Sequence, residues 1–167
     1  MIVTCDIKWS AHIEHICHKA SITLYQIFKC IKTKNIWTWV KLFNTYIRPK
    51  LEFNTPIWSP FLVKDINLIE SIQRRFTKIA FNKCSIPFTS YEDRLQKINI
   101  LSLQKRREYF DLVLMYRVIN NLSDLRFEDY FIIKSSDYFP RSHCLQIQAK
   151  YKFSSSQRLN SFSEEYL

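Results

Sequence analysis

The helix expected to organise this protein lies in the stretch Asp65-Ile-Asn-Leu-Ile-Glu-Ser-Ile-Gln-Arg-Arg-Phe-Thr-Lys-Ile-Ala80. Its apolar residues recur three or four positions apart, as on one face of an α-helix: they are Ile66, Ile69, Ile72, Phe76, Ile79 and Ala80. At about 100° per residue, Arg74 and Lys78 fall almost opposite that face, and Arg75 falls on its flank. Asp65 suits the start of the helix, because a carboxylate is favoured at the positive end of the helix dipole. The stretch therefore predicts an amphipathic helix with a basic outer face.

The same spacing predicts two helices before this one. The first runs from Ser10, which suits an N-cap, to about Ile31, with its apolar residues in a single stripe. The second starts at Ile36, and Pro49 must kink or end it because the proline ring clashes with the preceding turn. Two further prolines then bracket Ile57-Trp58-Ser59, which we expect to be extended.

Two helices and a less regular tail are predicted after it. Thr89 and Glu92 form a capping box that opens a short helix, and Asn99 ends this helix in a left-handed conformation. The next helix runs from Ser102 to about Asn120, and we expect its second half to be the most buried helix because it is apolar on nearly every side. Residues 143–153 alternate loosely between apolar and polar, as in a strand or hairpin.

Composition supports a folded protein, and the helical spacing of its apolar residues makes it mainly α. The chain has 167 residues, of which 47% are hydrophobic, and a net charge of +10. No apolar run is long enough to span a bilayer at about 20 residues, and the N-terminus does not resemble a signal peptide, so we expect an intracellular location, in the cytoplasm or the nucleus. The predicted fold is a helical bundle of about five helices over residues 1–131, with an irregular or short β-hairpin tail over residues 132–167 that is truncated.

The absence of glycine excludes several classes of enzyme. With Gly 0, the chain cannot form a glycine-rich phosphate loop, a Rossmann fingerprint or a lipase-type nucleophile elbow, all of which need close backbone approach. Positions with positive φ must be filled by other residues, and asparagine tolerates this region best. The candidates are Asn54, Asn99, Asn120 and Asn121.

Cysteine and histidine do not form a convincing metal site. The five cysteines are widely and irregularly spaced without a CxxC pair, which argues against a disulfide framework. Potential metal ligands gather only near the N-terminus, at Cys5, His12, His15, Cys17 and His18. On a helix His12 and His15 share a face but Cys17 and His18 point elsewhere, so we favour surface histidines and a buried Cys17 over zinc.

Several short motifs follow one another along the chain. Phe43-Asn-Thr-Tyr-Ile-Arg-Pro-Lys-Leu-Glu-Phe53 precedes Pro56-Ile-Trp-Ser-Pro60 and Leu68-Ile-Glu-Ser-Ile-Gln-Arg-Arg-Phe-Thr-Lys78. The series also includes residues 6–13, 91–95, 101–107, 116–122 and 158–162. In this order and at this spacing, roughly residues 5–163 resemble the region after the catalytic palm in the reverse transcriptases of non-LTR retrotransposons, the jockey-like and LINE-type RNA-directed DNA polymerases.

The resemblance implies a non-catalytic, thumb-like segment that grips the RNA/DNA template–primer duplex. The polymerases of this family carry an aromatic-x-Asp-Asp motif in the palm, whose carboxylates hold Mg²⁺. This chain has no Asp-Asp dipeptide, so we expect a fragment that lacks palm and fingers, has no catalytic residue, metal site or cofactor of its own, and is inactive alone. Its expected partners are the nucleic acid and the missing palm and fingers, not a membrane. Self-association through exposed apolar surface near Trp9 or Trp58 is also expected.

Positive charge is concentrated in residues 74–107, which hold nine Lys or Arg against only Glu92 and Asp93. Concentrated positive charge on a helical scaffold is typical of proteins that hold a phosphate backbone. The candidate nucleic-acid-binding residues are Arg74, Arg75, Lys78, Lys83, Lys105 and Arg106. Arg74 and Lys78 are the best placed of these. Arg106 and Arg107 could equally be structural, with Arg107 paired to Asp111 one turn later.

Other interpretations remain open at this point. The basic residues could simply solubilise helix faces, in a host-adopted stand-alone binding or interaction module or in a remnant without function. A basic amphipathic protein of the membrane surface is least favoured, because the helical stripes suit packing against one another. Trp37, Trp39 and Trp58 could stack on bases, although packing in the core is the better interpretation for tryptophans on an apolar stripe.

Overall fold

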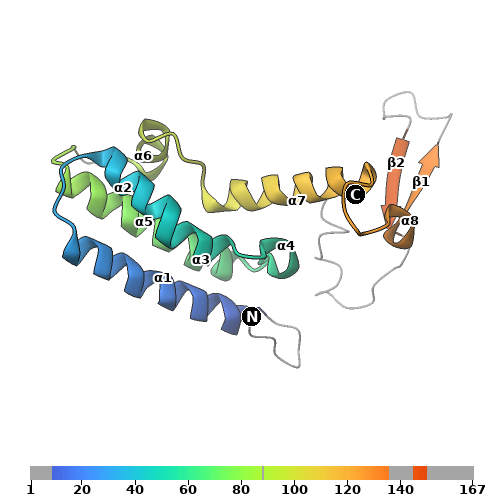
Figure 1. Cartoon of the computed structure of the whole chain (residues 1–167), viewed down its shortest axis with the longest axis horizontal. Coiled ribbons are helices and arrows are strands. Elements are labelled where there is room, and N and C mark those ends of the chain that lie inside the picture. Colours follow the sequence, from blue (N-terminus) through green and yellow to red (C-terminus); the bar gives the residue numbers. More distant parts are fainter. Residues whose placement is uncertain (1–8, 88, 136–144, 150–167) are drawn as a thin grey trace. The chain divides into compact units, whose positions relative to one another are not determined.

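The computed structural model describes residues 9–87, 89–135 and 145–149. The chain divides into two compact units, Met1–Glu108 and Tyr109–Leu167, and each is described by itself. The described residues are mainly helical, which confirms the predicted fold class (Figure 1).

The first unit is built from helices that differ widely in length. Its elements are α1 (Ser10–Cys30), α2 (Ile36–Leu42), the π-helical turn η1 (Phe43–Ile47), α3 (Arg48–Glu52), α4 (Thr55–Trp58), α5 (Val63–Lys83), α6 (Tyr91–Lys97) and the first turns of α7 (Leu103–Ile119). Helix α1 packs along α5 and α3, while α2 and α6 also contact α5 (Figure 1). Helix α5, predicted from the Asp65–Ala80 stretch, therefore lies at the centre of the unit.

The core of the first unit forms where the apolar stripes of α1, α5 and the α2–η1–α3 segment meet. Aromatic rings fill its middle: Phe28 stacks on Trp39 and Phe43 stacks on Phe76, with 4.6 Å between ring centroids in each pair. These arrangements add favourable ring–ring contact to the burial of apolar area. The stripes predicted for the first three helices are confirmed by this cluster.

Pro49 changes the second helix without ending it. After α2 the backbone widens into η1, where the Arg48 N–H donates to the carbonyl of Phe43, five residues earlier. Pro49 then occupies the first turn of α3, where its missing N–H costs no helical hydrogen bond. The π-turn thus lets the chain keep a helical path past a proline.

The expectation of an extended segment is wrong for Ile57 and Trp58, while Ser59 lies beyond the helix with φ −46° and ψ 123°. Thr55–Trp58 forms the short helix α4, because Pro56 lies in its first turn, where the fixed φ of proline favours a helix. Asn54 turns the chain into α4 with φ 59°. The indole N–H of Trp58 donates to the Phe53 carbonyl at 2.8 Å, and this bond holds the turn closed.

Two predicted helix caps are displaced by one residue. Helix α1 has Trp9 at its N-cap position, and the Ser10 hydroxyl instead donates to the Asp65 carboxylate at 2.7 Å. Helix α6 is capped by Ser90, whose hydroxyl accepts from the N–H of Asp93 at 3.1 Å, and not by Thr89. At α1 the tertiary hydrogen bond to Asp65 takes the Ser10 hydroxyl away from a capping role.

Three of the four asparagines proposed for positive φ adopt it. Asn54, Asn99 and Asn121 have φ between 50° and 59°, whereas Asn120 does not belong to this set. Ser85, just after α5, also has φ 55° and was not predicted. A left-handed residue commonly ends a helix, and in this glycine-free chain a serine takes that position.

In the second unit, the distal part of α7 is less buried than predicted. Leu112 and Tyr116 are exposed, while Met115 and Val118 pack with Phe127 of α8 (Phe127–Tyr130). The alternation of exposed and buried positions shows that one side only of this segment is covered. The expectation of the most buried helix is therefore wrong.

The chain beyond α8 forms an antiparallel pair of strands. Strand β1 (Phe131–Ser135) pairs with β2 (Leu145–Ala149), with Phe131 opposite Ala149. Strand β2 falls inside the 143–153 segment predicted to be a strand or hairpin, and the rest of that segment lies outside the described residues. Among the helices that the structure describes, none combines the length and the apolar character needed to cross a membrane.

Candidate nucleic-acid interface

The outward face of α5 is basic, as predicted. Arg74, Arg75 and Lys78 are all exposed on it, and Lys64 is exposed in its first turn. Neither acidic residue of α5 shares this face, because Asp65 and Glu70 are both buried. An exposed helix face with four cations and no carboxylate attracts polyanions.

Glu70 is buried because three donors reach its carboxylate. The Tyr91 hydroxyl donates to it, as do the backbone N–H groups of Leu103, at 3.4 Å, and Gln104, at 3.3 Å. These N–H groups open α7, so the negative charge lies at the positive end of that helix dipole. Burial, and then the hydrogen bond to Glu70, raises the pKa of Tyr91, so the phenol remains a donor. One carboxylate thereby joins α5, α6 and α7.

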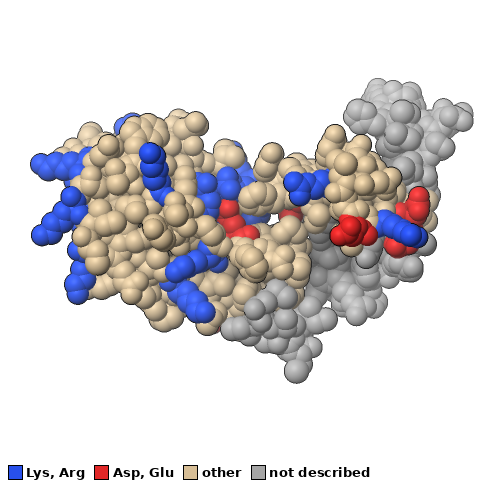
Figure 2. All heavy atoms as spheres, viewed as in Figure 1, with Lys and Arg blue, Asp and Glu red and all other residues tan. Residues whose placement is uncertain are grey.

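Two other carboxylates of the first unit are also held by donors. Asp65 accepts from the Ser10 hydroxyl at 2.7 Å. Glu52 accepts two hydrogen bonds from the Arg106 guanidinium, at 2.6 and 3.0 Å. These contacts remove acidic groups from the surface. Within residues 9–108 that the structure describes, twelve Lys or Arg are exposed against four Asp or Glu, and Figure 2 shows Lys and Arg standing out over this unit.

Tyr91 also positions Arg74. The Arg74 guanidinium lies 5.2 Å from the centre of the Tyr91 ring, and the Arg94 guanidinium lies 5.8 Å from it. A cation over an aromatic face is attracted by the ring quadrupole. Arg94 is buried and donates to the Thr77 hydroxyl and the Thr89 carbonyl. Arg94 is therefore part of the scaffold, while Arg74 is held at its surface.

Lys83 was predicted to bind nucleic acid, but its ammonium group is engaged within the protein. Its Nζ donates to the carbonyl of Phe28 at 2.9 Å, near the C-terminal end of α1. The same Nζ lies 5.8 Å from the Phe28 ring and 5.6 Å from the Trp39 ring. A cation at this helix end satisfies a carbonyl that the helix leaves open. The helical angle of Lys83 on α5 falls beside Phe76, and this sequence signal could have placed it inside.

Arg106 is likewise engaged, by Glu52, and the hydrogen bonds to Glu52 raise the pKa of Arg106. Burial, together with the nearby charge of Arg106, lowers the pKa of Arg48. Arg106 therefore joins α7 to α3, whereas Lys105 is exposed.

Arg107 is only 3% exposed, so it packs within the protein. Its pairing with Asp111, which is also buried, stays a prediction.

The tryptophans separate into core and surface residues. Trp39 and Trp58 are fully buried, which confirms core packing for both. Trp37, in the first turn of α2, is 53% exposed and could stack on a base. Trp37 is not among the apolar-stripe positions of α2, and this spacing in the sequence indicates its exposure.

The histidines behave differently from one another. His12 was expected at the surface but is buried against Trp9 and Trp58, with ring centroids 6.4 and 5.4 Å away. Burial lowers the pKa of His12. His15 is exposed, and Cys17 is buried as predicted. Cys5 lies outside the described residues, and no group of three metal-ligating side chains meets within the part of the chain that the structure describes.

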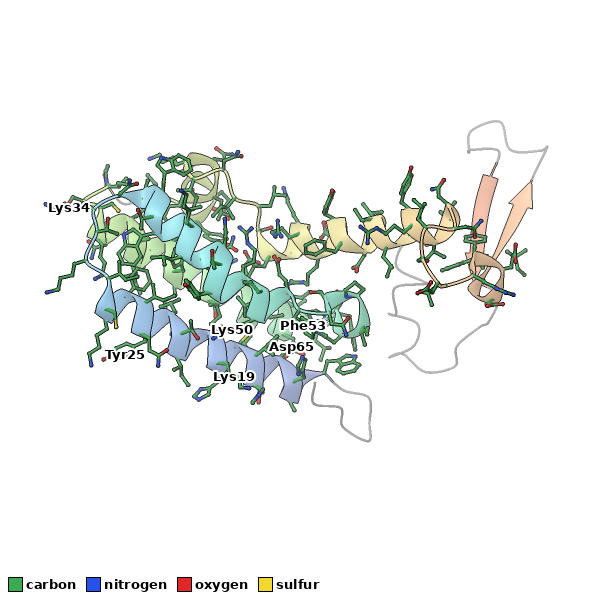
Figure 3. All side chains as sticks on the ribbon, viewed as in Figure 1. Lys19, Tyr25, Lys34, Lys50, Phe53 and Asp65 are labelled. Carbon is green, nitrogen blue, oxygen red and sulfur yellow. The ribbon has the colours of Figure 1, made fainter. Side chains whose placement is uncertain are left out.

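Exposed apolar side chains gather around the α4 region, near Trp58 in the chain. Phe53 is 79% exposed, and Ile57, Leu62 and Val63 are exposed as well. Figure 3 shows Phe53 near the end of α3, and Lys50 beside α1, where its Nζ donates to the Thr23 hydroxyl at 2.6 Å. The predicted exposed apolar surface is therefore present, and self-association through it stays a prediction.

Comparison with known proteins identifies a relative but no family. No family model matches the chain, and no solved structure matches it. The chain is similar to "Uncharacterized protein B0403.1" of Caenorhabditis elegans, with 26% identity over 144 residues, which span 85% of this chain and 71% of that protein.

Proposed function

We propose that the first unit grips the backbone of nucleic acid, as the non-catalytic region after the palm of a non-LTR retrotransposon reverse transcriptase. Its partner would be the RNA/DNA template–primer duplex. The observation that carries this proposal is the sorting of charge: Glu52, Asp65 and Glu70 are held by internal donors, while Arg74, Arg75 and Lys78 remain exposed on one helix.

Exposed cations on a helix face favour phosphate contacts over reading of bases. Phosphate contacts hold and orient a duplex without reporting its sequence. Arg74 and Lys78 are one helical turn apart, so their side chains lie on the same strip of surface. The contact of Arg74 with the Tyr91 ring restricts the guanidinium before binding, which reduces the entropy lost when a phosphate is bound.

The proposal assigns no chemistry to this chain. Phosphoryl transfer by a polymerase uses metal-bound carboxylates, and the sequence contains no Asp-Asp dipeptide. Any Mg²⁺ would belong to the palm of the parent enzyme. Lys83, Arg94 and Arg106 serve the scaffold, and Arg74, Arg75, Lys78 and Lys105 remain as candidates for contact with the nucleic acid.

Binding to a duplex and to a membrane surface can be compared in one experiment. The purified chain is titrated against a fluorescent RNA–DNA duplex between about 50 and 200 mM salt, and against vesicles rich in anionic lipid. We expect duplex binding that weakens steeply with salt, with no dependence on sequence and only weak vesicle binding. Binding to vesicles but not to the duplex would contradict the proposal.

A further inference from the structure

The basic face of α5 ends at a pocket. This pocket has a volume of about 350 Å³ and is lined by Lys78, Ile79, Phe81, Asn82, Ile86 and Arg94. Pockets of about 300 Å³ or more can enclose a small organic group. Lys78 belongs both to the basic face and to the pocket wall, so a strand bound along the face would pass the pocket.

The chemistry of the walls fits a nucleobase. Ile79, Phe81 and Ile86 supply apolar surface, which suits the faces of a flat ring. Asn82 offers an amide that can both donate and accept hydrogen bonds, as the edge of a base requires. Lys78 and Arg94 make the pocket cationic, and none of the described residues that line it is acidic. A base attached to a phosphate is complementary to this combination of apolar, amide and cationic groups.

A second pocket in the same unit also has apolar, amide and cationic groups in its wall, but it differs by a carboxylate. It has a volume of about 400 Å³, and Glu92 lines it together with Gln96, Asn99 and Lys105. A carboxylate in the wall disfavours the approach of a phosphate. Lys78 does not line this second pocket.

We propose that the pocket beside Lys78 receives one unpaired nucleobase from a strand whose phosphates lie along Arg74 and Lys78. This inference rests on the proposed function and adds to it. The module then holds a duplex by its backbone and additionally prefers a duplex that carries an unpaired base. Asn82 is the residue that contacts the edge of that base.

The test compares three ligands on the wild-type protein at one salt concentration. They are a blunt RNA–DNA duplex, the same duplex with a short single-stranded overhang, and that overhang with abasic nucleotides, which keep the phosphates and lack the bases. We expect the overhang to bind about fivefold or more tightly than the blunt duplex, because enclosing one base adds free energy of this order. The affinity for the duplex with the abasic overhang should lie within about twofold of the affinity for the blunt duplex.

Two matched variants locate the effect on the protein. Asn82→Leu should abolish the preference for the overhang, whereas Asn67→Leu, which changes an exposed asparagine of α5 away from the pocket, should retain it. Equal binding of intact and abasic overhangs, or an unchanged preference in Asn82→Leu, would overturn the pocket assignment while leaving the backbone grip intact. Failure of the wild-type chain to bind any of the three ligands would instead overturn the proposed function, and the pocket assignment with it.

Discussion

The Nζ of Lys83 donates a 2.9 Å hydrogen bond to the carbonyl of Phe28, which ties the last turn of α5 to the C-terminal end of α1. The ammonium group also lies over the Phe28 and Trp39 rings. A residue that looks like part of a basic surface in the sequence is therefore a packing residue. This relationship separates the stabilising cations of the first unit from those that can meet a ligand.

Replacing Lys83 should lower stability without changing nucleic-acid binding. Lys83→Met keeps the length and apolar stem of the side chain but removes the donor, so we expect a loss of about 1–2 kcal/mol in the free energy of unfolding. Lys64→Met, at an exposed position on the same helix, should change it by less than about 0.5 kcal/mol. Chemical denaturation measures both. A Lys83→Met protein of normal stability and weakened duplex binding would reassign Lys83 to the interface.

The ion pair between Arg106 and Glu52 should show measurable coupling. Its two hydrogen bonds form a fork between a guanidinium and a partly buried carboxylate, a geometry stronger than that of an ordinary surface pair. In a double-mutant cycle with Arg106→Gln and Glu52→Gln, we expect a coupling free energy of about 1–2 kcal/mol. Additive effects of the two substitutions would show that the pair contributes nothing to stability.

Buried His12 should make stability depend on pH. Its pKa is lowered from 6.5 by burial and by the charge of His15, so the unfolded chain binds a proton more readily than the folded one. Stability contributed by neutral His12 is therefore complete above pH 6.5 and is lost as the pH falls below that value. The Tm of the wild type should fall between pH 7.5 and 5.5 by more than the Tm of His12→Asn. Equal decreases in the two proteins would rule out His12 as the cause.

The purified chain should not extend a primer. We expect no incorporation of labelled nucleotide into an annealed template–primer with Mg²⁺ present, because the sequence offers no adjacent pair of aspartates to hold the metal ions. A known reverse transcriptase in a parallel reaction confirms that the substrate is competent. Incorporation that scales with the concentration of this chain would contradict the expectation.

The sequence predicted the long helices well, because their periodicity reflects burial directly. The stripe through Ile69, Ile72 and Phe76 lies in the core, as its spacing indicated. Positions where a residue can adopt either of two local structures or hydrogen bonds were harder to predict. Pro56 starts a helix instead of an extended segment, and Ser10 bonds Asp65 instead of capping α1, since these outcomes depend on neighbours distant in the chain or on a turn that only the fold defines.

Only the part of the candidate site that depends on helical angle could be predicted from the sequence. Exposure of Arg74 and Lys78 follows from their angle on α5, which the sequence contains. The engagement of Arg106 by Glu52 joins residues 54 positions apart, and no local pattern reports such a contact. Glu70 was not singled out, although a carboxylate on the flank of an apolar stripe is unusual enough to suggest an internal partner.

The central claim concerns which cations meet the phosphate backbone, and paired charge removals test it. The Arg74→Gln/Lys78→Gln variant removes two cations from the outward face of α5. The Lys19→Gln/Lys29→Gln variant removes two exposed cations from α1 and serves as the control of equal net charge. Both leave the apolar stripes unchanged, so differences in folding should be small.

The deciding measurement is the slope of log K against log salt for an RNA–DNA duplex, compared among the wild type and these two variants. Each lost phosphate contact should reduce the slope by about 0.9, so the α5 variant should lose about two units while the α1 variant stays close to the wild type. An unchanged slope in the α5 variant, or an equal loss in both variants, would contradict the assignment of the nucleic-acid interface to α5.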